Sequence, residues 1–192
     1  MIANTPPMGW NSWDCYGAAV TEEIVRKNAE YMAEHLKPFG WEYIVVDIQW
    51  SSPDATGHAY QPFSDLEMDE YGRLIPAVNR FPSAADGKGF RPLADYIHSL
   101  GLKFGIHIMR GMPRMAAHRR MPIEGSKYTC DTAANPQPSA CGIRICTVSG
   151  VNCRRQQLIM TASSVFTPPG EWTSLSAMIS HASIRTADGK LS

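Results

Sequence analysis

Two short apolar segments, separated by a helical pattern, constrain the fold of this chain most strongly. The first is Ile44–Val46, within residues 43–50, and the second lies within residues 103–111. A continuous apolar run of this length is typical of a strand buried on both faces, as in a parallel sheet. The sequence therefore predicts parallel strands in an α/β architecture.

Helical patterns precede both segments. Thr21 is a suitable N-cap, two acidic residues follow it, and apolar residues then recur at helical spacing as far as Leu36. Pro38 and Gly40 end this helix, and a second helix is predicted over residues 90–100. The order strand, helix, strand, helix, strand predicts parallel pairing with right-handed crossovers.

Polar side chains gather where each predicted strand ends. They are Asn11 and Asp14, then Asp47 and Gln49, then His107 and Arg110. In α/β barrels the carboxyl ends of the strands form the active-site face. A dinucleotide-binding sheet also places ligands there, but no G-x-G-x-x-G motif follows the first strand of this chain.

The segment Pro6–Asp14, with the sequence PPMGWNSWD, is rich in Trp, Gly and Pro. The prolines extend the chain, and we expect neither a helix nor an ordinary alternating strand here. Two indole rings with Asn, Ser and Asp between them combine flat apolar faces with hydrogen-bonding groups, which suits a sugar ring. The alternative is a buried Trp pair at the start of a domain.

The composition limits the partners. Lys plus Arg and Asp plus Glu both number 18, which argues against nucleic acid or an anionic membrane as the main partner. No segment approaches the ~20 apolar residues of a membrane span. The first residues do not have the pattern of a signal peptide, so the default expectation is a cytoplasmic protein. The five cysteines are an odd number, which leaves at least one unpaired.

Four segments resemble the α-galactosidases of glycoside hydrolase family 27. They are PPMGWNSWD, YIVVDIQW, RFPSAADGKGFRPLADYIHSLGLKFGIH and IMRG, and the resemblance covers about residues 5–141. It implies that residues 1–141 form the N-terminal part of a (β/α)8 barrel, about its first three β/α units. It also implies a retaining glycosidase with two catalytic Asp residues, no metal or organic cofactor, and a small α-galactoside-like carbohydrate as substrate.

The same resemblance implies roles for individual residues. The family's D-D-C-W motif is Asp47-Ile48-Gln49-Trp50 here, so one sugar-binding acid is kept and the second is Ile48. His107 stands where the family has the Tyr of a G-I-Y motif, so the specificity for galactose stays open. The predicted substrate-binding residues are Trp10, Asp47, His107, Gln49 and Arg110, with Gln49 or His107 supplying the missing polar contact.

Each of these residues also has a structural alternative. Asp47 would then cap a strand end, His107 would be a hydrogen-bonded core histidine, and Arg110 would be a solvated surface residue. Trp13 and Trp50 are expected to pack rather than to touch a ligand. The acids between Asp65 and Glu70 lack the glycine of a calcium loop, so we expect a solvated hairpin there.

The sequence after Cys141 has no persistent helical or strand period. Family members continue with W-[ND]-x-D-M-Y-G-V and later with K-x-D-D. Read one frame over with permitted codons, Cys141–Ser149 can encode WDPDMYGV, and Leu158–Ser180 can encode YYDSVFSFYAAWGVDFVKCDDI. We infer that the coding frame is lost near Cys141 and expect residues 142–192 to form an irregular, poorly structured tail.

This frame loss predicts an inactive chain. A retaining glycosidase needs two carboxyl groups about 5 Å apart, and the nucleophile implied by the family is the first Asp of K-C-D-D. An open sheet of three strands would also expose apolar edges and self-associate. The alternatives are a non-catalytic carbohydrate-binding fragment and a Cys-dependent redox or metal module over residues 130–153. The latter lacks the C-x-x-C spacing typical of zinc sites.

Overall fold

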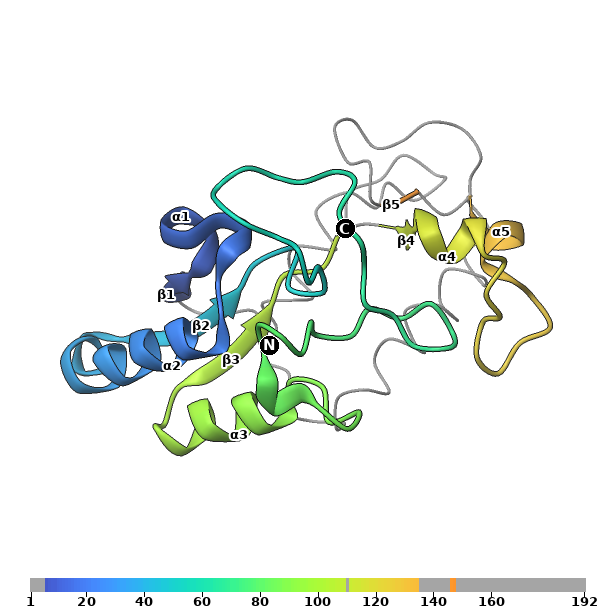
Figure 1. The fold of residues 1–192 in the computed structure, drawn as a ribbon. Helices are drawn as coiled ribbons and strands as arrows, with labels where there is room; N and C mark the ends of the chain where they lie inside the picture. Colours follow the sequence, from blue (N-terminus) through green and yellow to red (C-terminus); the bar gives the residue numbers. More distant parts are fainter. Residues whose placement is uncertain (1–5, 110, 135–145, 148–192) are drawn as a thin grey trace, which may run out of the picture.

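Three parallel strands form the central sheet of this chain (Figure 1). The computed structural model describes residues 6–109, 111–134 and 146–147. The strands are β1 (Met8–Asn11), β2 (Trp41–Val46) and β3 (Lys103–Ile106), in the order β1-β2-β3 with both pairs parallel. The predicted parallel α/β arrangement is therefore confirmed for these strands, whereas closure into a barrel is not seen in the described residues.

Helix α2 (Glu22–Tyr31) connects β1 to β2 and begins as predicted. The Thr21 side chain accepts a hydrogen bond from the backbone N–H of Ile24 at 3.5 Å, which satisfies one of the free donors of the first turn. The helix continues through a wider turn and a 3-10 turn, which are Met32–Leu36 and Lys37–Phe39. Gly40 then ends it with a φ of 89°, a left-handed conformation that glycine adopts readily.

Helix α3 (Arg91–Ser99) connects β2 to β3 and matches the second predicted helix. A cluster of buried side chains from the sheet, α2 and α3 makes the main core. Its larger members are Val20, Val25, Met32, Ile44, Val46, Trp50, Phe81, Leu93, Ile97 and Phe104. Trp50 packs edge-on against Phe90 with ring centroids 5.2 Å apart, so the expectation that Trp50 packs in the core is confirmed.

The expectation that the Pro6–Asp14 segment contains no helix is wrong. It forms β1 and then α1 (Ser12–Tyr16), a single short helix. The side chain of Asn11 accepts a hydrogen bond from the backbone N–H of Trp13 at 2.8 Å, which is the N-cap geometry that starts a helix. Asn11 and Ser12 were predicted as hydrogen-bonding groups for a sugar, and the capping role of Asn11 was missed.

Two predicted strands are shorter than expected. Residues 43–50 leave the sheet after Val46, where the Asp47 carboxylate accepts a hydrogen bond from the N–H of Ile48 at 2.7 Å. Gln49 has a φ of 66° and turns the chain away. Strand β3 ends at Ile106, although its ladder extends by one bond from the N–H of His107 to the carbonyl of Val46, at 2.8 Å.

A second, smaller cluster lies beyond β3. The chain after β3 forms β4 (Met112–Pro113), α4 (Arg114–His118) and α5 (Cys130–Ala133). Strand β4 pairs antiparallel with β5 (Cys146–Thr147). Its buried side chains are Met112, Ala116, Ile123, Cys130 and Ala133. Apart from β5, the predicted tail of residues 142–192 lies outside the described residues.

The helices of the described part are short. None of them has both the length and the apolar character that a membrane crossing requires.

Candidate functional site

The carboxyl ends of the three strands bring together three polar residues that are far apart in the sequence. Asn11 ends β1, Asp47 follows β2, and His107 follows β3. The register pairs Asn11 with Val45, and Val46 with Ile106, so the three residues lie side by side across the sheet. We call Asn11, Asp47 and His107 the carboxyl edge.

Asp47 is the centre of the carboxyl edge and is 7 % exposed. Its Oδ2 accepts a hydrogen bond from the side-chain amide of Asn11 at 2.7 Å. Its Oδ1 lies 2.7 Å from the backbone nitrogen of Ile48 and 3.0 Å from Nδ1 of His107. Its own N–H donates to the hydroxyl of buried Ser12 at 2.9 Å. Both the backbone and the side chain of Asp47 are therefore fixed.

These contacts set the charge of Asp47. Burial by itself raises the pKa of this carboxyl, but the hydrogen bonds from His107, the Ile48 N–H and Asn11 outweigh it and lower the pKa overall. The group is therefore an ionised carboxylate at neutral pH. Because a carboxylate only accepts, Nδ1 of His107 carries the shared proton, and the 29 % exposed imidazole keeps Nε2 as its second polar atom.

Trp10 lies on β1, one residue before Asn11, and is in register with Ile44. Its half-buried ring packs against the main core, and its centroid is 6.1 Å from that of Tyr16. The indole is therefore held in place beside the carboxyl edge. Its predicted contact with a sugar stays a prediction.

The side chain of Gln49 has protein partners. Its amide nitrogen donates to the carbonyl of Gln61 at 2.9 Å, and its amide oxygen accepts from the N–H of Gln61 at 2.9 Å. Ser64 Oγ lies 3.4 Å from the same amide nitrogen. Gln49 therefore anchors a loop in this structure, and of the two residues predicted to replace the missing acid, His107 has the less occupied side chain.

Arg110, the remaining predicted site residue, lies outside the described residues. Met109, the residue before Arg110, lines a hollow beside His107. The volume of this hollow is about 10 Å³, which is about the space of one water molecule. Its lining is mostly apolar and includes Ile48, Leu66 and Ile108. The carboxyl edge is thus bordered by apolar side chains.

Sequence patterns did not indicate Arg80, which holds the backbone at Gln49, two residues after Asp47. Arg80 is 6 % exposed, and its guanidinium donates to four backbone carbonyl oxygens. They belong to Ala18, Val20, Gln49 and Ser52. Burial lowers the pKa of Arg80 to about 10, although the charge of Asp54 opposes this shift. Arg80 stands in the R-F-P segment that resembles the family, but no sequence pattern indicated that its partners are carbonyl groups.

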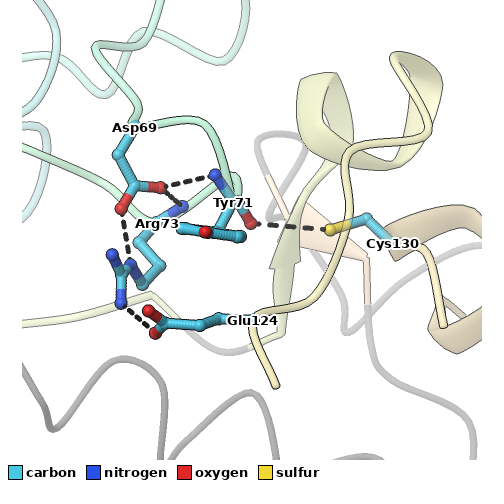
Figure 2. Close-up of polar contacts among 5 residues, drawn as sticks. All are labelled: Asp69, Tyr71, Arg73, Glu124 and Cys130. Atoms are coloured by element: carbon cyan, nitrogen blue, oxygen red, sulfur yellow. Dashed lines mark hydrogen bonds and ion pairs between the residues drawn. The ribbon is translucent and has the colours of Figure 1, made fainter. Parts of the chain in front are cut away.

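The acidic segment after Asp65 forms the predicted hairpin, with an antiparallel bridge between Met68 and Leu74. One of its acids is not solvated. Figure 2 shows Arg73 between two carboxylates, with Nε 2.5 Å from Asp69 and Nη1 2.5 Å from Glu124. This pair of contacts joins the hairpin to the segment that carries α4 and α5.

Cys130, on α5, also contacts the hairpin. Its sulfur lies 3.9 Å from the carbonyl oxygen of Tyr71, as Figure 2 shows, and burial raises the pKa of its thiol to about 11. A thiol with a raised pKa is a poor nucleophile and metal ligand at neutral pH. The other cysteines of the predicted 130–153 module lie where side chains are not described, and the described residues contain no group of three potential metal ligands.

Comparison with known proteins finds similarity to alpha-galactosidases. The family model of alpha galactosidase A matches residues 5–160 of this chain. The alpha-galactosidase of Cyamopsis tetragonoloba is 35 % identical over 122 residues, which are 63 % of this chain and 25 % of the plant enzyme. The chain thus spans about a quarter of that relative.

Some solved structures are more similar in sequence. The β-L-arabinopyranosidase of Geobacillus stearothermophilus, a member of glycoside hydrolase family 27, is 64 % identical with a TM-score of 0.73. The match covers 79 % of this chain and 34 % of that one. A second structure of this enzyme, in complex with arabinose, has a TM-score of 0.76 and 48 % identity and covers 84 % of this chain and 46 % of that one.

Proposed function

Because the chain belongs to the alpha-galactosidase A family, which is glycoside hydrolase family 27, we propose that its carboxyl edge binds the terminal sugar of a small glycoside. Asp47 and His107 are the groups that bind sugar hydroxyls, and Trp10 supplies an apolar face. The sugar has the galactose arrangement of ring hydroxyls. This proposal needs no metal, cofactor, nucleic acid or membrane.

The geometry of Asp47 carries this proposal. An ionised carboxylate offers about four lone-pair positions, and three of them accept hydrogen bonds from Asn11, Ile48 and His107. Oδ1 has two of these donors and Oδ2 has one, so Oδ2 keeps capacity for a further donor. A sugar hydroxyl is such a donor, and a hydrogen bond to a charged acceptor contributes about 1.5–3 kcal/mol.

Ile48 favours one sugar within this class. Where the family motif has a second acid, Ile48 offers no hydrogen bond and lines the apolar hollow beside His107. β-L-Arabinopyranose has the ring hydroxyls of α-D-galactopyranose without its polar hydroxymethyl group. The relative at 64 % identity is a β-L-arabinopyranosidase, whereas the plant α-galactosidase is 35 % identical. We therefore favour a β-L-arabinopyranoside over an α-galactoside as substrate.

The chain as written is proposed to bind this sugar without cleaving it. Retaining glycosidases use two carboxyl groups about 5 Å apart, and the motif K-x-D-D that resemblance assigns to the nucleophile is absent from these 192 residues. With permitted codons, the segment Leu158–Ser180 can encode this motif when it is read one frame over. The chain is then a non-catalytic carbohydrate-binding piece of a glycosidase.

Restoring the reading frame tests this proposal. The chain as written should release no nitrophenol from nitrophenyl β-L-arabinopyranoside or nitrophenyl α-D-galactopyranoside, while a gene repaired near Cys141 and extended to full length should yield an active enzyme. Sequencing the gene around Cys141 checks the premise. Turnover by the chain as written, abolished by Asp47→Ala, would disprove the proposed loss of activity.

A further inference from the structure

A loop that follows β2 is held at three places, by hydrogen bonds to Ala18, Gln49 and Ser51. We call this loop, residues 56–67, the strap, and Figure 1 shows it in teal, arching on the side toward which the strands point. The carbonyl of Gly57 accepts from the N–H of Ala18 at 3.1 Å, and the N–H of Glu67 donates to Ser51 at 2.8 Å. Gln49 holds the strap between these two points.

The hold by Gln49 is specific. Its amide forms two hydrogen bonds with the backbone of Gln61, both 2.9 Å, as a neighbouring strand would. Gln49 is 4 % exposed and has a φ of 66°. A residue other than glycine keeps this conformation only where its surroundings enforce it. The strap is therefore fixed in position relative to Asp47, two residues before Gln49.

The strap presents one aromatic ring to solvent. Phe63 is 80 % exposed and lies between Gln61 and Ser64, both of which contact the amide of Gln49. Phe39, the other strongly exposed phenylalanine of the described part, is 74 % exposed and lies at the opposite end of the sheet. A single exposed ring is ordinary on a protein surface, and what distinguishes Phe63 is that its loop is held by Gln49, which lines the hollow beside His107.

The surroundings of Phe63 limit what it can bind. Asp65 and Glu67 are exposed on the same strap, so an anionic ligand would be repelled. Leu66, three residues after Phe63, lines the hollow beside His107, so the strap borders the place where the terminal sugar would lie. An aromatic face next to a sugar site suits the C–H face of a second sugar or a flat aryl group.

We propose that Phe63 is the stacking platform for the aglycone, the neutral sugar or aryl group attached to the terminal sugar. This inference rests on the proposed function, because the terminal sugar has to be held at the carboxyl edge. Gln49 is then a positioning residue, since it fixes the strap that carries the platform. The amide of Gln49 bonds the backbone of Gln61, so Asp47 and His107 are the residues that bind the sugar hydroxyls.

Calorimetric titration of the intact chain tests the platform. Free L-arabinose and D-galactose report on the terminal sugar alone, and nitrophenyl β-L-arabinopyranoside and nitrophenyl α-D-galactopyranoside add an aryl aglycone. Phe63→Ala should weaken binding of the preferred nitrophenyl glycoside about fivefold, in line with an aromatic stacking contact. It should leave binding of the free sugar unchanged, and the matched variant Phe39→Ala should change neither.

Gln49→Ala provides a second variant, because it releases the strap without removing the ring, and it should weaken the nitrophenyl glycoside more than the free sugar. If Phe63→Ala leaves the nitrophenyl glycoside unaffected while the free sugar still binds, the platform is disproved and the proposed function stands. If the unaltered chain binds neither free sugar nor glycoside, the proposed function fails, and the platform fails with it.

Discussion

The two ends of the central sheet differ in chemistry, although the same three strands form both. At the amino end, Met8, Phe39 and Trp41 are 40 %, 74 % and 37 % exposed. At the carboxyl end, Asp47 and Gln49 are 7 % and 4 % exposed although both are polar. The carboxyl end thus buries polar groups, whereas the amino end of the described sheet does not, although apolar side chains face water at both ends, as Ile108 and Phe63 do at the carboxyl end.

The difference lies in how the backbone is held. The backbone at the carboxyl end is fixed by side chains from distant segments. The hydroxyl of Ser12 accepts a hydrogen bond from the N–H of Asp47, and the guanidinium of Arg80 donates one to the carbonyl of Gln49. The amino end has the ion pair of Lys103 and Glu42, at 2.5 Å and partly exposed, and such pairs contribute little. A site that needs fixed polar groups is therefore best supported at the carboxyl end.

The largest expected effect comes from Arg80→Met. It leaves four buried carbonyl oxygens without their donor, and the loss of such a network costs about 3–5 kcal/mol of unfolding free energy. Urea unfolding followed by circular dichroism measures it. The matched control is Arg91→Met, because the Arg91 side chain is 71 % exposed. Equal stability of the two variants would show that the hydrogen bonds from Arg80 to the four carbonyl oxygens do not stabilise the fold.

Gly9→Ala tests the close approach of β1 to β2, on which both ends of the sheet depend. A Cβ at Gly9 would lie 2.3 Å from the carbonyl oxygen of Tyr43, so β1 and β2 would have to separate. We expect a loss of about 2–3 kcal/mol, typical of overpacking. Gly105→Ala on β3 is the control, since its nearest neighbour would be Val45 Cγ2 at 3.5 Å. The same urea experiment compares them, and a tolerated Gly9→Ala would contradict the close strand approach.

Acid should weaken the carboxyl end selectively. The pKa of Asp47 is lowered from its usual 3.8, because the hydrogen bonds from His107, Ile48 and Asn11 outweigh the opposing effect of burial. Its contribution to stability is therefore complete above about pH 4 and is lost as the pH falls through the lowered folded value. Asp47→Asn cannot titrate, so its difference in urea midpoint from the unaltered chain should shrink between pH 7 and pH 3. A difference independent of pH would contradict this account.

The smallest effect is expected at the amino end. Phe39→Ser removes an exposed ring and should change the unfolding free energy by no more than about 0.5 kcal/mol. It should also reduce self-association, which light scattering measures, because the exposed apolar patch becomes smaller. A large loss of stability would mean that this end is as closely packed as the other.

The sequence predicted what depends on local patterns. The N-cap at Thr21, the end of the helix at Gly40 and the second helix were confirmed, because capping and apolar spacing act within a few residues. Asn11, Asp47 and His107 were expected at strand ends, and parallel pairing places them side by side.

What the sequence left out depends on contacts across long separations. Gln49 was predicted to touch sugar, but its partners Gln61 and Ser64 lie 12 and 15 residues away, and no local pattern indicates them. Arg80 donates to carbonyl groups up to 62 residues away, and backbone carbonyls leave no trace in a sequence. The capping role of Asn11 was local, however, and the Asn-Ser-Trp order contained the signal that was missed.

Calorimetric titration of L-arabinose into the unaltered chain and into Asp47→Asn measures whether the carboxyl edge binds a sugar. The account predicts saturable binding by the unaltered chain and at least about tenfold weaker binding by Asp47→Asn, since a hydrogen bond to a charged acceptor is lost. Phe39→Ser should bind like the unaltered chain. Equal affinity of the unaltered chain and Asp47→Asn, or no binding by either, would contradict a sugar site at the carboxyl edge.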